Sequence, residues 1–257
     1  MKLKRYGTAS ILLEQDGTQL LFDPFFPLSG KVFKPSLSEL SAVKNILVTH
    51  GHLDHLAGIP TILKHGGGTV YCTAKQHETL ISKGVDEVHI CKIAAGDVLN
   101  FGPVSVRVLK GKHIVFDKRL ILKTFLRACF SNWGNLRYLL KENKQCLEAG
   151  ETVVYDISVS RKRVLLLGSL NLDDGTAYPA GVDLLILPLQ GRSDISQYAM
   201  QFAERLQPKK ILLDHFDDTF PPISSRVNTD YFTSLMRQKF PDIPVICPQA
   251  GDCMDIE

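Results

Sequence analysis

The chain lacks an unbroken run of the ~18 apolar residues that a membrane-spanning helix needs. Its first residues, Met1 to Tyr6, are charged and lead into no apolar core of a signal peptide, so export by that route is not expected. None of the six cysteines belongs to a Cys-x-x-Cys pair, and a chain of 257 residues is too long to resemble a disulfide scaffold. We expect reduced, mostly buried thiols in a cytoplasmic protein.

A strong net charge is also missing: the chain has +3, which speaks against extensive contact with nucleic acid. The positive charge is local, because the stretch 118–144 contains seven Lys and Arg residues and only one acidic residue, Glu142. Apolar residues make up 44% and charged residues 22%, as in ordinary globular proteins. The sequence contains no tandem repeat and no linker. We therefore expect one domain over residues 1–257, with an insert at about 118–145.

Short apolar runs separated by turn signals predict strands in groups, with helices between and after them. Asp16-Gly17 separates two such runs and is a hairpin signal. The pattern predicts a layered α/β arrangement of two sheets packed face to face, with helices outside. The predicted strands cover 10–13, 19–22, 45–49, 69–72, 104–108, 152–157, 163–167, 183–187, 211–213 and 245–247. The predicted helices cover 59–64, 75–83, 193–206 and 229–239.

The insert has the pattern of two amphipathic helices. Apolar residues recur at helical spacing, while Lys123 and Arg127 fall on another face. A break at 132–135 separates the two runs, which contain Leu122, Phe125, Leu126 and Cys129, then Leu136, Leu139 and Leu140. We predict a helical hairpin, either a cap whose charges attract an anionic substrate or a pair that packs on the body or on a second subunit. A role at a membrane surface is not expected, although a basic amphipathic helix permits it.

Three histidines and an aspartate fall within six positions, after the predicted strand 45–49. These residues are His50, His52, Asp54 and His55. Imidazole nitrogens and carboxylates are the ligands that suit zinc, iron or manganese. Unpaired buried imidazoles cost free energy, so this run has no benefit for a core. The alternative is a solvated polar loop. The spacing favours a metal site.

The run His-x-His-x-Asp-His after a strand resembles the metallo-β-lactamase superfamily, and more narrowly the branch that includes the ascorbate-6-phosphate lactonases. The resemblance covers nearly the whole chain apart from the insert. It includes the hairpin ending in Phe22-Asp23-Pro24, the histidine loop and a closing strand region at 248–251. It implies an αββα sandwich of two mixed sheets flanked by helices, with the metal site at one edge.

The resemblance also implies the remaining ligands. His50, His52 and His113 would hold one ion, and Asp54, His55 and His215 the other. The alternative for His113 is a surface histidine in a Gly-Lys-His turn, and the ligand role is favoured. The histidines His65, His77 and His89 lie on polar stretches and receive no role.

One position departs from the family pattern. Many relatives have an aspartate that bridges the two ions, whereas Gly168 is followed here by Ser169, a poor bridging ligand. Asp173 and Asp174 are the candidates to replace the bridging aspartate, and the number of ions, one or two, is left open. Asp23 is expected to accept a hydrogen bond from a ligand histidine and fix its tautomer, or else to form an Asp-Pro turn.

The resemblance implies a hydrolase with a metal-activated water. Zinc is the expected cofactor, with manganese or iron as alternatives, and Asp54 would orient the water and take its proton. The expected substrate is a small ester, lactone or phosphoester, anionic in view of the basic insert. The alternatives are a phosphodiesterase or ribonuclease of the same superfamily and a metal-binding protein without turnover. A homo-oligomer is compatible with the sequence, and nucleic acid is not an expected partner.

Overall fold

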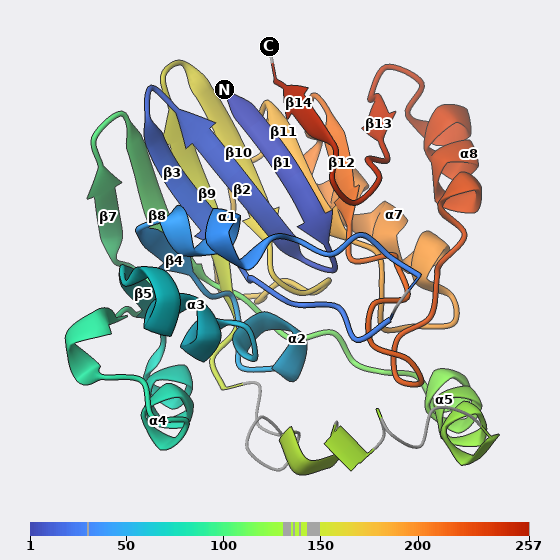
Figure 1. Ribbon diagram of the computed structural model, residues 1–257. Coiled ribbons are helices and arrows are strands. Elements are labelled where there is room, and N and C mark those ends of the chain that lie inside the picture. The colour runs from blue at the N-terminus through green and yellow to red at the C-terminus, as the bar shows by residue number, and fades with distance from the viewer. Residues whose placement is uncertain (30, 131–134, 136, 139, 143–149, 257) are drawn as a thin grey trace.

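The computed structural model describes residues 1–29, 31–130, 135, 137–138, 140–142 and 150–256. They form two seven-stranded sheets that pack face to face and are flanked by helices (Figure 1). The two-sheet α/β architecture predicted from the sequence is confirmed. Within these residues, every helix is too short or too polar to cross a membrane.

The first sheet has the strand order β14-β1-β2-β3-β4-β5-β6. Strands β2 and β3 form the predicted hairpin, whose turn residues Asp16 and Gly17 both have positive φ. Strands β3 to β6 are parallel to one another. The bounds are β1 Lys2–Gly7, β2 Ser10–Gln15, β3 Thr18–Phe22, β4 Asn45–Leu47, β5 Thr69–Cys72, β6 Ile90–Lys92 and β14 Cys253–Asp255.

The second sheet has the order β13-β12-β11-β10-β9-β8-β7. Strands β7 to β10 are antiparallel, and β10 to β13 are parallel, so both sheets are mixed. The bounds are β7 Val98–Phe101, β8 Val104–Lys110, β9 Val153–Val159, β10 Lys162–Leu167, β11 Leu184–Pro188, β12 Ile211–Asp214 and β13 Val245–Ile246.

Helices cover the outer face of each sheet. The first sheet packs on α1 (Leu37–Ala42) and α3 (Ile59–Gly66), and the second on α7 (Ile195–Leu206) and α8 (Thr229–Lys239). The other helices before the predicted insert are α2 (Leu53–Leu56), α4 (Ala74–Ser82) and the 3-10 turn η1 (Glu87–His89).

The interlayer core consists of apolar side chains from the facing surfaces of both sheets. Leu13 and Phe22 of the first sheet share one buried cluster with Val106 and Ile157 of the second. Tyr155 crosses this layer and donates its hydroxyl hydrogen to the carbonyl of Val48 at 2.6 Å. The contact aligns the end of β4 with the second sheet, which matters for the residues that follow β4.

The predicted insert begins with α5 (Lys118–Phe130), the first of its two predicted helices. The described residues after it, 135, 137–138 and 140–142, have helical backbone. Asn135, predicted as part of the break, is helical, while Leu136, Leu139 and positions 132–134 lie outside the described residues. The expected strand region at 248–251 is wrong: it forms a turn, and the closing strand is β14.

Candidate metal centre

Three of the six candidate ligands follow the ends of strands, and the other three lie at the start of α2 or within it. His50 follows β4 of the first sheet, whereas His113 follows β8 and His215 follows β12 of the second sheet. Asp54 and His55 belong to α2, whose first turn begins directly after His52. The sequence run at 50–55 therefore meets residues that are 58 or more positions away along the chain.

The structure brings these side chains into two groups. His50, His52 and His113 each offer a nitrogen, and the three atoms lie within 4.8 Å of one another. The same limit holds for ligand atoms of Asp54, His55 and His215. Rings of His52 and His113 have centroids 4.5 Å apart. The structure therefore brings together the same two sets of residues that the family resemblance implied.

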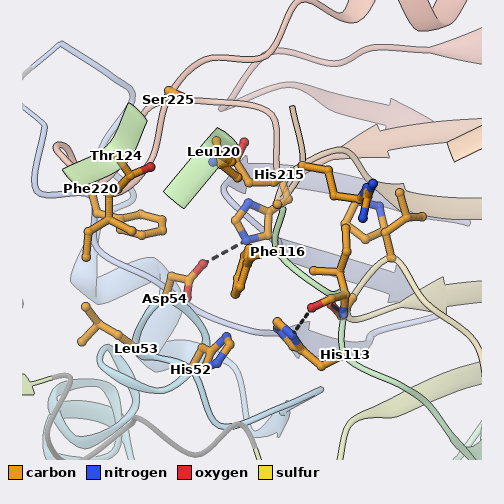
Figure 2. Close-up of a pocket in the computed structure, with 18 of the residues that line it drawn as sticks. His52, Leu53, Asp54, His113, Phe116, Leu120, Thr124, His215, Phe220 and Ser225 are labelled. Carbon is orange, nitrogen blue, oxygen red and sulfur yellow. Dashed lines mark hydrogen bonds and ion pairs between the residues drawn. The ribbon is translucent and has the colours of Figure 1, made fainter. Parts of the chain in front are cut away.

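In the second group, Asp54 faces both histidines. Its Oδ2 lies 2.9 Å from Nε2 of His215 and 3.6 Å from Nε2 of His55. Figure 2 shows Asp54 pointing toward His215, with His52 and His113 beside each other nearby. All three members of the group are buried or nearly so. An imidazole–carboxylate cluster of this kind has the donor atoms that zinc, iron and manganese accept.

Asp23 lies on the far side of His55 from Asp54. Its Oδ2 is 2.8 Å from Nδ1 of His55. The backbone N–H of Thr49 donates to Oδ1 at 2.8 Å, and the Thr49 hydroxyl donates to Oδ2 at 2.6 Å. Asp23 is fully buried, so these contacts replace water. The contact holds His55 with Nδ1 protonated and leaves Nε2 directed at Asp54.

Burial and charge set different protonation states in the two groups. Burial lowers the pKa of His50 and His113, and it lowers the pKa of His52 to about 4. His55 differs: burial lowers its pKa, but Asp23 and Asp54 outweigh burial and raise it to about 9. Burial raises the pKa of Asp54, yet His55 and His215 hold it below the ordinary value. The first group is therefore neutral and the second is a charged cluster.

His113 is held in one tautomer by its own backbone. The carbonyl of Ile114 can only accept, so Nδ1–H of His113 donates to it at 2.8 Å and Nε2 keeps its lone pair. The next amide, Ile114 N–H, donates to the hydroxyl of Ser169 at 3.0 Å. Asn171 Nδ2 donates to the carbonyl of His113 at 3.1 Å. The loop carrying this histidine is thus fixed by the chain that follows β10.

Ser169 therefore orients the His113 loop, and its hydroxyl already accepts a backbone N–H. It lines the same cavity as the histidines. Gly168 precedes it because a Cβ there would lie 2.1 Å from Cβ of Thr49, a distance that no side chain tolerates.

Asp173 and Asp174, considered as replacements for a bridging aspartate, do not lie with the six ligands. Asp173 accepts from the Thr176 hydroxyl at 2.8 Å and pairs with Lys110 at 3.1 Å. Asp174 is 88% exposed and lies 3.6 Å from Lys112. Neither aspartate lines the cavity, because both carboxylates are directed toward lysines at the end of β8, Lys110 and Lys112.

Several supporting residues escaped the sequence reasoning. Thr49, next to His50, lies within 3.1 Å of Nδ1 of that histidine as well as bonding Asp23. The backbone N–H of His215, at φ 52°, donates to the Thr8 carbonyl at 2.8 Å. Thr8 in turn donates its N–H to Asp217, which pairs with the buried Arg5 at 3.0 Å. The only sequence signal was the adjacency of Thr49 to the histidine run.

Asp214, just before His215, was also missed as a site neighbour. Its carboxylate is almost fully buried. Burial raises the pKa of Asp214 to about 7, although His215 and Arg5 lower it. A buried acid next to a candidate ligand adds negative potential to the second group.

The two groups form part of the wall of a cavity of about 560 Å³. Much of the remaining wall is apolar and comes from the segment 114–125 and from the loop around Phe220 (Figure 2). Its apolar lining includes Ile114, Phe116, Leu120, Ile121, Phe125, Phe220 and Ile223. Among the lining residues the structure describes, Arg192 is the one Lys or Arg side chain, and it pairs with Asp194 at 2.6 Å. The basic residues of α5 point elsewhere.

Residues 18–120 match a family model described as a β-lactamase superfamily domain. A UPF0173 metal-dependent hydrolase of Ligilactobacillus salivarius is 28% identical over 233 residues, covering 89% of this chain and 90% of the relative. A similarly named protein of Desulforamulus reducens is 28% identical over 229 residues, covering 87% of each chain.

Solved structures share the fold. Igni18, a metallo hydrolase from Ignicoccus hospitalis, has a TM-score of 0.66 and 17% identity, covering 100% of this chain and 99% of its own. An isothiocyanate hydrolase from Delia radicum gut bacteria has a TM-score of 0.65 and 15% identity, covering 99% and 98%. Zn(2+)-bound PqqB of Methylobacterium extorquens has a TM-score of 0.57 and 16% identity, covering 96% and 86%. The narrower lactonase branch stays a prediction.

Proposed function

We propose that the chain is a member of the metallo-β-lactamase superfamily and a metal-dependent hydrolase of a small molecule, in view of the family model that it matches and the relatives that it resembles. The supporting observation is that His113 and His215 meet the histidine run at 50–55, so that six side chains form two ligand groups at one cavity. Its sequence relatives are named metal-dependent hydrolases. The proposed centre is the cavity wall formed by these two groups.

The donor set fits a bound metal. His50, His52 and His113 are kept neutral by burial, as ligands must be. Zinc is the proposed ion, with manganese and iron as alternatives. The first group has no carboxylate whereas the second has Asp54, so two bound ions would differ in affinity. When bound, such an ion lowers the pKa of water to about 7 and polarises a carbonyl or phosphoryl oxygen. Asp54, whose pKa is held below the ordinary value, would accept a hydrogen bond from the attacking water and orient it.

The cavity supports a substrate with an apolar body. Phe116, Leu120 and Phe125 would pack on that body while an ester, lactone or phosphoester group meets the histidines. Arg192, the one Lys or Arg side chain among the described lining residues, is paired with Asp194, so the anionic character of the substrate stays a prediction. Among the four cysteines whose burial is described, only Cys72 is buried and Cys253 is exposed, so the expectation of mostly buried thiols is wrong for them. A cytoplasmic location stays a prediction.

Metal analysis followed by a substrate screen tests this function. The purified protein is assayed for bound metals, stripped with a chelator, and reloaded separately with zinc, manganese or iron. Each form is then offered lactones, carboxylic esters and phosphodiesters, with apolar and polar members of each class. We expect hydrolysis to return with one metal and to favour apolar members.

The same screen separates the alternatives. Turnover confined to phosphodiesters or RNA would indicate the phosphodiesterase or ribonuclease reading. Tight metal binding without hydrolysis of any class would indicate a metal-binding protein without turnover. A protein that holds no metal under any loading condition would refute the proposal.

A further inference from the structure

Helix α5 exposes a large apolar surface. Leu122 is 60% exposed and Leu126 is 49% exposed, and neither lines the cavity. Ile121 and Phe125, exposed by 55% and 64%, line the cavity mouth as well. Together with Val115 and Phe116 just before the helix, these residues make one exposed patch, here called the α5 patch. Apolar patches of this kind mark interaction surfaces.

Basic residues border the α5 patch along the same helix. Lys118, Arg119 and Lys123 are exposed, and the 13-residue helix contains no acidic residue. Leu122 and Leu126 are one turn apart, as are Arg119 and Lys123, so an apolar row lies beside a basic row. Arg127 donates to the Ser224 carbonyl at 3.0 Å and lies 3.5 Å from Asp218, which fastens the helix to the body.

The position of α5 leaves this surface accessible. Figure 1 shows the helix at the periphery, away from both sheets. Its half-buried residues Leu120 and Thr124 line the cavity, so the helix has one side against the cavity and another toward solvent. Ile121 and Phe125 join the two sides into a continuous apolar surface.

We propose that α5 binds the surface of an anionic lipid bilayer, with the α5 patch among the acyl chains and its basic row among the headgroups. An amphipathic helix with Leu and Phe on one face and Lys and Arg beside it has this property, and anionic lipid attracts the basic residues. The cavity mouth then opens toward the bilayer. This revises the expectation that a membrane surface is no partner.

Charge argues against a second copy as the occupant. A two-fold contact places the same surface of each subunit against the other. Pairing α5 with α5 would bring Arg119 and Lys123 of both copies together, with no acidic residue on either helix. An anionic bilayer offers the opposite charge as well as an apolar interior.

Vesicle flotation with the full chain tests the proposal. Vesicles are made of phosphatidylcholine alone or of phosphatidylcholine mixed with phosphatidylglycerol, at low and high salt. We expect binding to the anionic vesicles, weaker binding at high salt and little binding to the neutral ones. Leu122→Ser/Leu126→Ser should lower the partition coefficient about tenfold or more, and Arg119→Glu/Lys123→Glu should do so by about tenfold or more.

Matched controls change exposed residues elsewhere. Val88→Ser removes a 77% exposed apolar side chain, and Lys64→Glu reverses an exposed charge on α3. Both should bind vesicles like the parent protein. The α5 variants leave the cavity lining intact, so their circular dichroism, metal content and turnover of soluble substrates should be unchanged. That result separates this inference from the proposed function.

Three outcomes would overturn the inference. The first is absence of vesicle binding by the parent protein. The second is equal binding by the parent and both α5 variants. The third is self-association in the absence of lipid that Leu122→Ser/Leu126→Ser abolishes, since the α5 patch would then be a subunit contact. Size-exclusion chromatography over a range of protein concentrations detects the third.

Discussion

The two ligand groups are neighbours that differ in electrostatics. The first, His50, His52 and His113, contains imidazoles only, which burial keeps neutral. The second contains the Asp54 carboxylate and a His55 that is protonated near neutral pH. A cation entering the first group meets free lone pairs, whereas one entering the second must displace a proton. Proximity in space therefore does not make the groups equivalent.

Removing one ligand from each group should have the largest effect. We expect His52→Ala and Asp54→Ala each to lower kcat/KM by about 10³-fold or more. His52→Ala removes a ligand of the metal that would activate the water, and Asp54→Ala removes the carboxylate that would orient it. His52→Ala should reduce metal at the first group and Asp54→Ala at the second, as measured by metal stoichiometry.

His65→Ala is the matched control for these two variants. His65 is exposed and bonds only the Thr61 carbonyl among its described contacts, so its loss should leave both readouts unchanged. A His52→Ala/Asp54→Ala double variant with full activity would contradict the assigned centre.

Asp23 contacts His55 of the second group directly and His50 of the first group only through Thr49, so its loss should weaken the second group more. Asp23→Ala leaves the Thr49 N–H, the Thr49 hydroxyl and His55 without their acceptor. We expect the metal-free protein to lose about 3 kcal/mol of unfolding free energy in urea titrations. Metal affinity of the second group should fall by about 10–100-fold in competition with a chelator.

Asp174→Ala, at a carboxylate that is 88% exposed, is the control and should change neither quantity. An Asp23→Ala protein that keeps the parent metal affinity would show that the carboxylate does not orient His55.

The pH dependence of metal uptake should distinguish the groups. His55 has a raised pKa of about 9, so at pH 7 it carries a proton that an entering ion displaces. Affinity at the second group should rise about tenfold per pH unit from 7 toward 9 and then level off. His52, with a pKa of about 4, carries no proton at pH 7, so affinity at the first group should be flat there.

Calorimetric titration in buffers of different ionisation enthalpy counts the protons released. We expect about one proton for the second group and none for the first. Equal release from both would mean that the electrostatic difference is absent.

We expect the smallest effect from removing Ser169, whose hydroxyl accepts a hydrogen bond from the loop that carries His113 of the first group. Ser169→Ala removes the acceptor for the Ile114 N–H and frees the His113 loop. We expect a loss of about 1 kcal/mol in unfolding free energy and a modest loss of metal affinity at the first group alone. Ser36→Ala, at an exposed hydroxyl that contacts Ser38, is the control. Loss of affinity at the second group instead would contradict the division of roles.

The sequence predicted elements whose pattern is local. The run Ile46-Leu47-Val48 was recognisable as a buried strand because it is fully apolar, and the helix 229–239 was recognisable from its own residues. The histidine run likewise indicated a metal site without reference to the rest of the chain. Strand β1 was missed because Lys4 and Arg5 interrupt it, and Arg5 is buried through a partner 212 positions away, Asp217. Tertiary pairing of this kind has no local signature.

The types of ligand residue at the site could be predicted from the sequence, whereas the contacts that position these residues could not. Spacing did not reveal that Asp173 pairs with Lys110 or that Ser169 holds the His113 loop, because both depend on how the chain turns after β10. Amphipathicity identified α5, but which face meets the cavity follows from packing against the loop around Phe220.

The candidate ligands come from segments that follow strands of both sheets, so an ion bound here would cross-link the two layers at one end of the sandwich. Opening that end would then require coordination bonds to break as well as apolar contacts to separate. We expect amide hydrogens around His50 and His215 to exchange slowly in the loaded protein and much faster after chelation. Resistance to proteolysis would then track metal supply, so the amount of intact protein in a cell would itself report on metal availability.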